Sequence, residues 1–530
     1  MSYIARPSFI LRFAALLVSS LVALHVLDRG SPLSAQPNPA VVGQWSAVQN
    51  WPAVSVHAAM LPTGKVLFYP YTDEPRLWDP ITAAFATAAS VGFNPFCSGL
   101  TLLADGRLFI GGGHISNDVG LNDASVYDPI SNTWTRQPDM NAGRWYPTTT
   151  TLADGSTLII SGNIDLNVGV NLLPQVWTNG SWRDLTTAQL GLPYYPMMML
   201  APNGKVFYAG PEQLTRFLDT SGTGTWTNSA TSAGGYRTYG SAVMYEPGKI
   251  LLVGGSDPPL KSAELIDLNQ ANPTWRPTGS MAIARRQLNA TVLPDGTVLV
   301  TGGSSGGGFN NSDAPVYSAE RWNPADGTFT TLASATRYRG YHSIALLLPD
   351  GRVLSSGGDG EPNGEVFSPP YLFKGARPTI TSVPATLVYG QPFSIATPDA
   401  AAITAVTLVR LSTVTHSTNM NQRFLRLPFT TGSGVLNLTT PSPAATAPPG
   451  DYMLFVLNGN GVPSVASIVR VGLGNPPAAP SNLSATAVSS SRINLAWTDN
   501  ASTELGVRIE RSIDGTMFSD LTTVGQNATS

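Results

Sequence analysis

Short apolar runs separated by tight turns dominate the chain from about residue 42 to residue 371. In the segment Leu103–Phe109 (LADGRLF), an Asp-Gly turn separates two apolar stretches, and similar segments recur along the chain. Glycine adopts positive φ in such a turn, and Asp or Asn closes the turn through its side chain. Each segment is therefore predicted to be a β-hairpin.

The predicted hairpins recur at a nearly constant interval. Seven turn glycines stand at positions 64, 106, 155, 204, 248, 296 and 351, so consecutive turns lie 42, 49, 49, 44, 48 and 55 residues apart. Glycine pairs or triplets follow most hairpins, and an aromatic residue follows later in the repeat. This is the kelch pattern of β-propellers, in which neighbouring blades cover each other's faces. The repeat predicts an all-β fold, with a seven-bladed kelch-type β-propeller over residues 42–371.

Two further segments follow the repeats. After a linker at residues 374–378, residues 376–473 alternate like strands without the turn motif, which predicts an immunoglobulin-like β-sandwich. A proline-rich linker then leads to residues 480–530, whose first strands resemble those of a fibronectin type III domain. Such domains need roughly 100 residues, so we expect a partial domain. Contact with a carbohydrate or a cell surface is one role open to this segment.

The N-terminus has the features of a signal peptide over residues 1–35. Arg6 and Arg12 precede a mostly apolar stretch at 13–27, and small residues follow at 31–35. The apolar stretch is short for a membrane span, although an uncleaved signal anchor is the alternative. We expect an exported protein, secreted or at the cell surface, with no membrane span in the mature chain.

Composition excludes several kinds of function. Hydrophobic residues make up 42% and charged residues 12%, which is enough apolar material for a folded core. The net charge of −3 provides no basic field for nucleic acid. Cys97 is the single cysteine, so internal disulfides and Cys-rich zinc or iron–sulfur sites are excluded. Besides His25 in the leader, four histidines are available for imidazole chemistry.

Chemically distinctive residues stand at matching positions in three of the repeats. They lie nine or ten positions before their turn glycines: Cys97 before Gly106, Tyr146 before Gly155, and Tyr341 and His342 before Gly351. Matching repeat positions lie at equal radius and height in a ring, so these side chains are expected to converge near its axis. His416, in the predicted sandwich, is a further candidate.

This set contains two imidazoles, two phenols and one thiol. Two nitrogens and two oxygens with a vacant position suit copper(II), and the lack of a carboxylate cluster argues against calcium and magnesium. A Tyr-His pair at the start of a strand is usually structural, because adjacent strand residues point to opposite faces. Tyr341 and His342 can therefore share a metal only where the backbone is irregular. His57 and His114 are expected to support the structure rather than bind metal.

Taken in order, these segments resemble the galactose oxidase and glyoxal oxidase family, the copper radical oxidases. The resemblance covers residues 42–473 and rests on five segments: 94–99, 144–147, 339–343, 414–423 and 461–467. It implies two-electron oxidation of a small aldehyde hydrate or primary alcohol by O2, with release of H2O2.

The resemblance also implies a role for each residue. Tyr146 would be an equatorial copper ligand, joined to Cys97 by a thioether and able to hold a radical. His342 and His416 would be the other equatorial ligands. Tyr341 would be the axial ligand and the base that takes the substrate's hydroxyl proton.

The sequence departs from galactose oxidase in three respects. Ile164 stands where galactose oxidase has the tryptophan that stacks on the cross-linked tyrosine, and we expect no carbohydrate-binding domain before the propeller. The segment Arg144–Tyr146 is closer to the glyoxal oxidase branch. The alternative interpretations are a non-catalytic kelch propeller that binds a carbohydrate or protein ligand, and an enzyme of this fold that has lost activity.

Overall fold

The computed structural model describes residues 38–472, 479–501, 506–513, 515, 518–525 and 528–530. The predicted signal peptide at 1–35 lies outside the described residues. Short helical turns occur in the described part of the chain: α1 (Pro39–Val42), η1 (Pro370–Phe373) and η2 (Ala400–Ala402). No helix in this part of the chain combines the length and the apolar character needed to cross a membrane.

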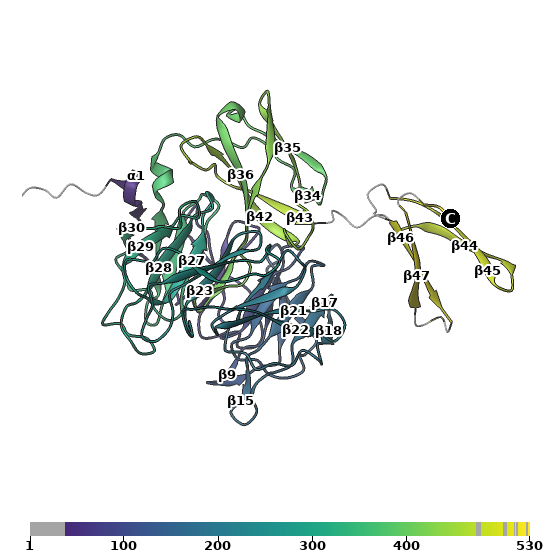
Figure 1. Ribbon diagram of the computed structural model, residues 1–530, viewed down its shortest axis with the longest axis horizontal. Coiled ribbons are helices and arrows are strands. Elements are labelled where there is room, and N and C mark those ends of the chain that lie inside the picture. The colour runs from purple at the N-terminus through teal and green to yellow at the C-terminus, as the bar shows by residue number, and fades with distance from the viewer. Residues whose placement is uncertain (1–37, 473–478, 502–505, 514, 516–517, 526–527) are drawn as a thin grey trace, which may run out of the picture. The chain divides into compact units, whose positions relative to one another are not determined.

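Seven antiparallel sheets within the described residues form the blades of a propeller (Figure 1). The all-β fold class predicted from the repeats is confirmed. Each blade starts with one of the predicted hairpins, as in blade 2, where Gly106 takes φ = 84° between β7 (Gly99–Leu102) and β8 (Leu108–Gly111). From blade 2 round to blade 1, the first strands of successive blades contact one another.

The first three blades have the following strands. Blade 1 contains β3 (His57–Met60), β4 (Val66–Tyr69), β5 (Arg76–Trp78) and β6 (Phe85–Thr87). Blade 2 contains β7 (Gly99–Leu102), β8 (Leu108–Gly111), β11 (Ala124–Asp128) and β12 (Thr133–Gln137). Blade 3 contains β13 (Thr148–Thr151), β14 (Thr157–Ile160), β17 (Gln175–Thr178) and β18 (Ser181–Asp184). Two small hairpins extend blades 2 and 3: β9 (His114–Ser116) with β10 (Val119–Gly120), and β15 (Asn163–Asp165) with β16 (Gly169–Val170).

The next three blades repeat the pattern. Blade 4 contains β19 (Met197–Leu200), β20 (Val206–Gly210), β21 (Leu214–Asp219) and β22 (Thr225–Thr231). Blade 5 contains β23 (Ser241–Glu246), β24 (Lys249–Val253), β25 (Ala263–Asp267) and β26 (Arg276–Pro277). Blade 6 contains β27 (Arg286–Val292), β28 (Val298–Ser304), β29 (Ser318–Trp322) and β30 (Phe329–Ser334).

Blade 7 joins the two ends of the propeller sequence. It contains β31 (Ser343–Leu347), β32 (Val353–Gly357) and β33 (Asn363–Ser368), and its outer edge is completed by β1 (Gln44–Trp45) and β2 (Gln49–Asn50). Trp45 lies opposite Phe367 in this pairing. Backbone hydrogen bonds between the first and last strands of the propeller sequence therefore close the ring.

The segment after the propeller forms two packed sheets with their own hydrophobic core. One sheet contains β34 (Thr386–Val388), β43 (Ser467–Gly472), β42 (Gly450–Asn458), β36 (Ile403–Arg410) and β39 (Phe424–Leu427). The other contains β35 (Pro392–Ala396), β41 (Val435–Thr439) and β40 (Phe429–Gly432). The described C-terminal residues form two hairpins: β44 (Ser481–Ser489) with β45 (Arg492–Thr498), and β46 (Gly506–Ser512) with β47 (Phe518–Gly525).

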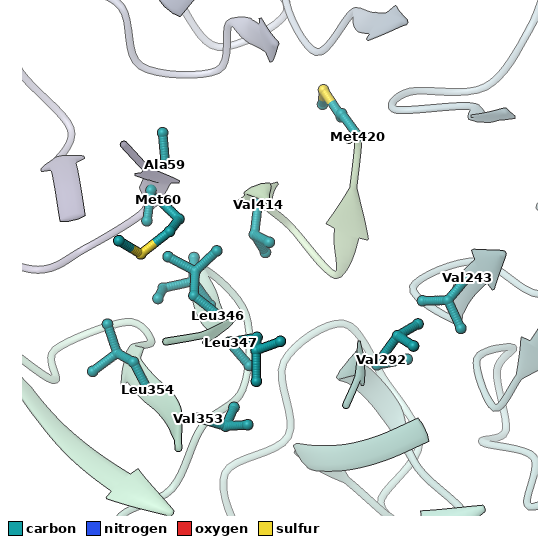
Figure 2. Packing of buried hydrophobic residues seen from close by; sticks show 14 of the residues in the cluster. Ala59, Met60, Val243, Val292, Leu346, Leu347, Val353, Leu354, Val414 and Met420 are labelled. Atoms are coloured by element: carbon teal, nitrogen blue, oxygen red, sulfur yellow. The ribbon is translucent and has the colours of Figure 1, made fainter. Parts of the chain in front are cut away.

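One hairpin from the sandwich sequence belongs to the propeller instead. The strands β37 (Thr413–Thr415) and β38 (Thr418–Asn419) extend blade 1 at its inner edge, where Thr415 lies opposite His57. Figure 2 shows Val414 of this hairpin close to Met60 of blade 1 and Leu346 of blade 7, and all three belong to one buried cluster. The hairpin thus fills the centre of the ring and carries His416 there.

Buried arginines fix the backbone that leads into four of the blades. Each guanidinium donates to a carbonyl at the end of the second strand of its blade, over 2.8–3.1 Å: Arg144 to Ser161, Arg237 to Gly254, Arg285 to Gly302 and Arg339 to Gly357. In three of these blades, a buried glutamate on the third strand pairs with the arginine: Glu264, Glu320 and Glu365. In each of these blades, the bonds of the arginine fix the position of the segment that leads into the first strand of the blade.

Replacing Glu320 with alanine should destabilise the propeller. The Arg285–Glu320 pair is almost fully buried with N···O of 2.6 Å, so removal of the carboxylate leaves an uncompensated buried cation, at a cost of about 3 kcal/mol. Glu246→Ala, which removes the exposed partner of Lys249, is the matched control and should change stability by roughly 1 kcal/mol or less. Thermal and denaturant unfolding of both variants measure this. Equal stability losses would contradict the role given to the buried pair.

Candidate active site

The residue nine positions before the turn glycine has a left-handed backbone in six of the seven blades. These residues, with their φ values, are Cys97 (65°), Tyr146 (69°), Tyr195 (44°), Tyr239 (54°), Gln287 (59°) and His342 (65°). Residues other than glycine rarely adopt this conformation, and it persists only where the surroundings enforce it. This conformation interrupts the regular alternation of side chains between the two faces of the strand, at the point where the chain reaches the centre of the ring.

This irregularity explains how Tyr341 and His342 reach one site. Consecutive residues of a regular strand would point to opposite faces. With His342 at φ = 65°, the two rings instead lie 3.8 Å apart between centroids. The irregular backbone that the sequence argument required is therefore present.

The five predicted site residues lie together at the centre of the ring. The phenol oxygens of Tyr146 and Tyr341 share a short hydrogen bond, and Nε2 of His416 lies 3.1 Å from the oxygen of Tyr146. The rings of His342 and His416 are nearly perpendicular, with centroids 4.5 Å apart. All five side chains are buried, and Tyr341 is the most exposed at 8%.

Each histidine is oriented by a partner on Nδ1. His342 Nδ1 lies 2.6 Å from Asp359, and His416 Nδ1 lies 2.5 Å from the hydroxyl oxygen of Thr415. That hydroxyl donates its hydrogen to the carbonyl of Val56, so it must accept the hydrogen on His416 Nδ1. The carboxylate of Asp359 likewise accepts from His342. In the neutral rings the lone pair therefore lies on Nε2. That of His416 faces the hydroxyl of Tyr146, whereas Nε2 of His342 is buried without a hydrogen-bond partner.

The surroundings oppose a charge on His416 and on the two phenols in the absence of a metal. Burial, together with the neighbouring His342 and His57, holds the pKa of His416 well below its usual range. Burial also raises the pKa of the phenols of Tyr146 and Tyr341 well above theirs. A phenolate would therefore form here only if a nearby positive charge stabilised it.

Cys97 is fixed against Tyr146 by its backbone. Its carbonyl accepts from the amide of Tyr146 over 2.8 Å, and its own amide donates to Nε2 of His57 over 3.0 Å. The side chain is fully buried. Burial raises the pKa of the thiol, whereas hydrogen bonds with the side chains of Tyr146 and Trp145 act in the opposite direction. The thiol and the phenol are thus direct neighbours.

Two aromatic rings stack on Tyr146. The indole of Trp145 is parallel to it within 6°, with centroids 3.9 Å apart, and the ring of Tyr195 lies 4.8 Å away at 25°. The sequence comparison with galactose oxidase placed Ile164 at the stacking position. In this structure Trp145, the residue directly before Tyr146, supplies the stacked indole. The left-handed φ of Tyr146 folds these two neighbouring rings onto each other.

Sequence reasoning missed three residues that share the repeat position of Cys97, Tyr146 and His342. These residues, Tyr195, Tyr239 and Gln287, also stand nine positions before a turn glycine, so the same count would have found them. Asp359 was also missed. Its position directly after the glycine pair gives no local signal, and only the fold brings it to His342.

A cavity of about 270 Å³ opens beside Tyr146 and His416. Four tyrosines dominate its wall: Tyr194, Tyr195, Tyr236 and Tyr239. Prolines and Met197 supply further apolar surface, and the lining contains no carboxylate, guanidinium or ammonium group. A small uncharged molecule could therefore approach the phenols and imidazoles from this side.

The chemistry of the cluster limits the kinds of metal site available. Among the described residues, no group of three or more His, Cys, Asp and Glu side chains is arranged to hold a metal ion. A metal at the centre of the ring would thus need the tyrosine oxygens as well as the two imidazoles. The donor set is then two nitrogens and two phenol oxygens, which suits copper(II).

Comparison with known proteins agrees with this architecture. The model of the glyoxal oxidase N-terminus family matches residues 256–373, the kelch motif matches 100–141, and the galactose oxidase-like Early set domain matches 377–471. These matches fall on the propeller blades and on the sandwich.

Individual relatives are oxidases. A galactose oxidase of Gibberella zeae is 31% identical over 519 residues, covering 86% of this chain and 74% of that protein. Aldehyde oxidase GLOX1 of Arabidopsis thaliana is 33% identical over 246 residues, covering 40% of each. A solved fungal alcohol oxidase in complex with copper superposes with a TM-score of 0.75 at 28% identity, covering 81% of this chain and 99% of that one.

Fold, site and relatives together define an oxidase built on a propeller and a sandwich. The chain belongs to the galactose oxidase and glyoxal oxidase family, the copper radical oxidases.

The buried thiol of Cys97 should resist alkylation in folded protein produced without copper. The side chain has no solvent exposure, and burial raises its pKa, so neither access nor the reactive thiolate is available at pH 8. Iodoacetamide labelling followed by mass spectrometry should show almost no modification in native buffer and complete modification in denaturant. Rapid labelling of the native protein would contradict this placement of Cys97.

Proposed function

We propose that this protein is an exported copper radical oxidase whose metal is held by Tyr146, Tyr341, His342 and His416. The observation that carries the proposal is the arrangement of the two imidazoles. Both are fixed through Nδ1, so that Nε2 carries the lone pair. Nε2 of His416 contacts the phenol oxygen of Tyr146, and Nε2 of His342 is buried without a partner. A buried imidazole nitrogen without a partner is costly unless a ligand binds it. Copper would satisfy that nitrogen and offset the charge of the phenolates.

Tyr146 is the residue proposed to hold the radical. Its ring is covered by Trp145 and Tyr195, which shield it from water and place π-systems beside it. The thiol of Cys97 is proposed to bond to a carbon of the Tyr146 ring. The new S–C bond replaces one S–H and one ring C–H bond, and dioxygen takes up the two electrons and two protons released. A thioether is not reduced as a disulfide would be, which suits the single cysteine of an exported protein.

Tyr341 is proposed to receive the hydroxyl proton of the substrate. Its oxygen already shares a hydrogen bond with Tyr146 and stands beside His342 and His416. When bound, copper supplies one of the two electron-transfer steps and the positive charge that favours phenolate. Oxidation of the alcohol carbon releases two electrons and two protons, and dioxygen accepts both pairs to form H2O2.

The substrate is proposed to be a small primary alcohol or aldehyde hydrate whose remaining part is uncharged. The cavity wall consists mainly of tyrosine and proline, without a charged side chain to pair with a carboxylate. Aromatic rings favour flat or apolar partners through area and stacking. We therefore favour aromatic or aliphatic primary alcohols and their aldehydes over galactose.

Export is proposed from the N-terminal segment. Residues 1–35 combine positive charge, an apolar stretch and small residues in the order of a secretory signal.

Peptide mapping tests the proposal directly. Protein matured with copper and air should yield the peptides of Cys97 and Tyr146 joined and two hydrogens lighter than the two separate peptides. Protein purified without copper, under nitrogen, is the control and should yield separate peptides. Separate peptides in the copper-matured protein would contradict the radical site.

Replacing Tyr146 with phenylalanine should abolish turnover. The variant keeps the ring that packs against Trp145 and Tyr195 but loses the oxygen and the ability to hold a stable radical. We expect kcat to fall by at least about 10³-fold with the unfolding temperature almost unchanged. A peroxide-coupled assay and thermal unfolding measure both. Substantial activity in this variant would refute the assignment.

Replacing Asp359 with asparagine should weaken metal binding. The carboxylate fixes the tautomer and orientation of His342, and loss of such a partner typically lowers metal affinity by about 10–100-fold. Asp350→Asn, in the turn of the same blade, is the matched control and should leave copper affinity unchanged. Competitive titration of copper against a chelator measures the difference. Equal affinities of the two variants would show that Asp359 has no orienting role.

Measured on a panel of substrates, kcat/KM should be higher for uncharged alcohols and aldehydes than for a substrate that carries a carboxylate. Benzyl alcohol and short aliphatic primary alcohols should give higher kcat/KM than glyoxylate, because the cavity offers aromatic surface and no cation for a carboxylate. Hydrogen peroxide release is the readout, and methylglyoxal serves as an uncharged aldehyde of similar size to glyoxylate. A preference for glyoxylate over methylglyoxal would contradict this view of the pocket.

A further inference from the structure

His57 lies next to the proposed copper ligand His416 but does not belong to the proposed ligand set. It begins β3 and is fully buried, with its ring stacked on Tyr69 at 4.5 Å and 13°. Its centroid lies 5.6 Å from that of His416. A histidine buried at this position has two possible roles: it binds the metal, or its ring forms hydrogen bonds that hold a neighbouring residue in place.

The hydrogen bonds of His57 decide between these two roles. Nε2 accepts the backbone amide of Cys97 over 3.0 Å. A backbone N–H can only donate, so Nε2 carries the lone pair and the ring hydrogen sits on Nδ1. Nδ1 is buried without a hydrogen-bond partner. The lone pair that could bind a metal is therefore already used by Cys97.

We infer that His57 positions Cys97 for formation of the thioether with Tyr146. This inference rests on the proposed function. Cys97 has a left-handed backbone with φ = 65°, a conformation that its side chain disfavours. Its carbonyl is held by the amide of Tyr146, and its amide is held by His57. These two bonds fix the peptide groups on both sides of Cys97 and thereby aim the sulfur at the phenol ring.

Removal of the imidazole would leave the amide of Cys97 without a partner. Cys97 has no solvent exposure, so bulk water does not directly replace the lost acceptor. The peptide group would turn toward another acceptor and release the left-handed φ, which moves the sulfur away from the ring of Tyr146. Bond formation depends on reacting atoms being held close together in the correct orientation, so it should slow sharply.

Three substitutions of His57 test this inference. His57→Phe keeps a ring that can stack on Tyr69 but has no acceptor, and His57→Leu removes the acceptor with a smaller apolar side chain. His57→Gln restores an acceptor oxygen. Each full-length protein is purified without copper under nitrogen and then given copper and air. The fraction of joined Cys97 and Tyr146 peptides is followed by mass spectrometry, alongside copper affinity and unfolding temperature.

We expect His57→Phe and His57→Leu to cross-link at least about 10-fold more slowly than the wild type, with copper affinity unchanged. His57→Gln should recover most of the wild-type rate. Cross-linking of the phenylalanine and leucine variants at the wild-type rate would overturn the inference. Failure of the glutamine variant to recover would also overturn it, since shape rather than the acceptor would then be decisive. If the phenylalanine variant does not fold, the comparison of leucine with glutamine decides in the same way.

The same experiment separates this inference from the proposed function. A wild-type protein that never forms the joined peptides contradicts the radical oxidase itself. A wild-type protein that forms them at a rate unaffected by His57 contradicts only the role of the histidine.

Discussion

The site depends on one backbone constraint, the left-handed residue at the point where six of the seven blades reach the centre of the ring. Such a conformation costs roughly 1–3 kcal/mol at a residue other than glycine. It recurs at six equivalent positions, and the residues there include Cys97, Tyr146 and His342. The cost is offset by neighbouring bonds, among them the buried arginines that fix the chain two or three residues earlier. A regular strand would send alternate side chains into the blade interfaces instead.

The second constraint comes from outside the propeller. The hairpin that carries His416 pairs with β3. The side chains of Asn421 and Gln422, which follow shortly after it, accept hydrogen bonds from the amides of Leu102 in blade 2 and Val292 in blade 6. The fourth proposed ligand is therefore in place only when the sandwich sequence is docked in the ring. Metal binding and the contact between the two domains should be coupled for this reason.

The repeat made most of the fold and much of the site predictable. The turn glycines revealed the blades, and the nine-residue spacing of Cys97 and Tyr146 indicated that their side chains would converge. The roles of His416 and the thioether came from the resemblance to a known family. The stacking of Trp145 was missed, because it depends on the φ angle of Tyr146 rather than on residue type. Asp359 and His57 act through contacts that only the folded ring creates.

The most direct test of the account is the ligand set of the metal. Electron paramagnetic resonance of protein loaded with copper(II) under nitrogen reports the nitrogens bound to the ion. The account predicts coupling to two imidazole nitrogens in the wild type, to one in His342→Ala and in His416→Ala, and to two in His57→Gln. Spectra that keep both nitrogens after either alanine substitution would contradict the convergence of these residues on one copper ion.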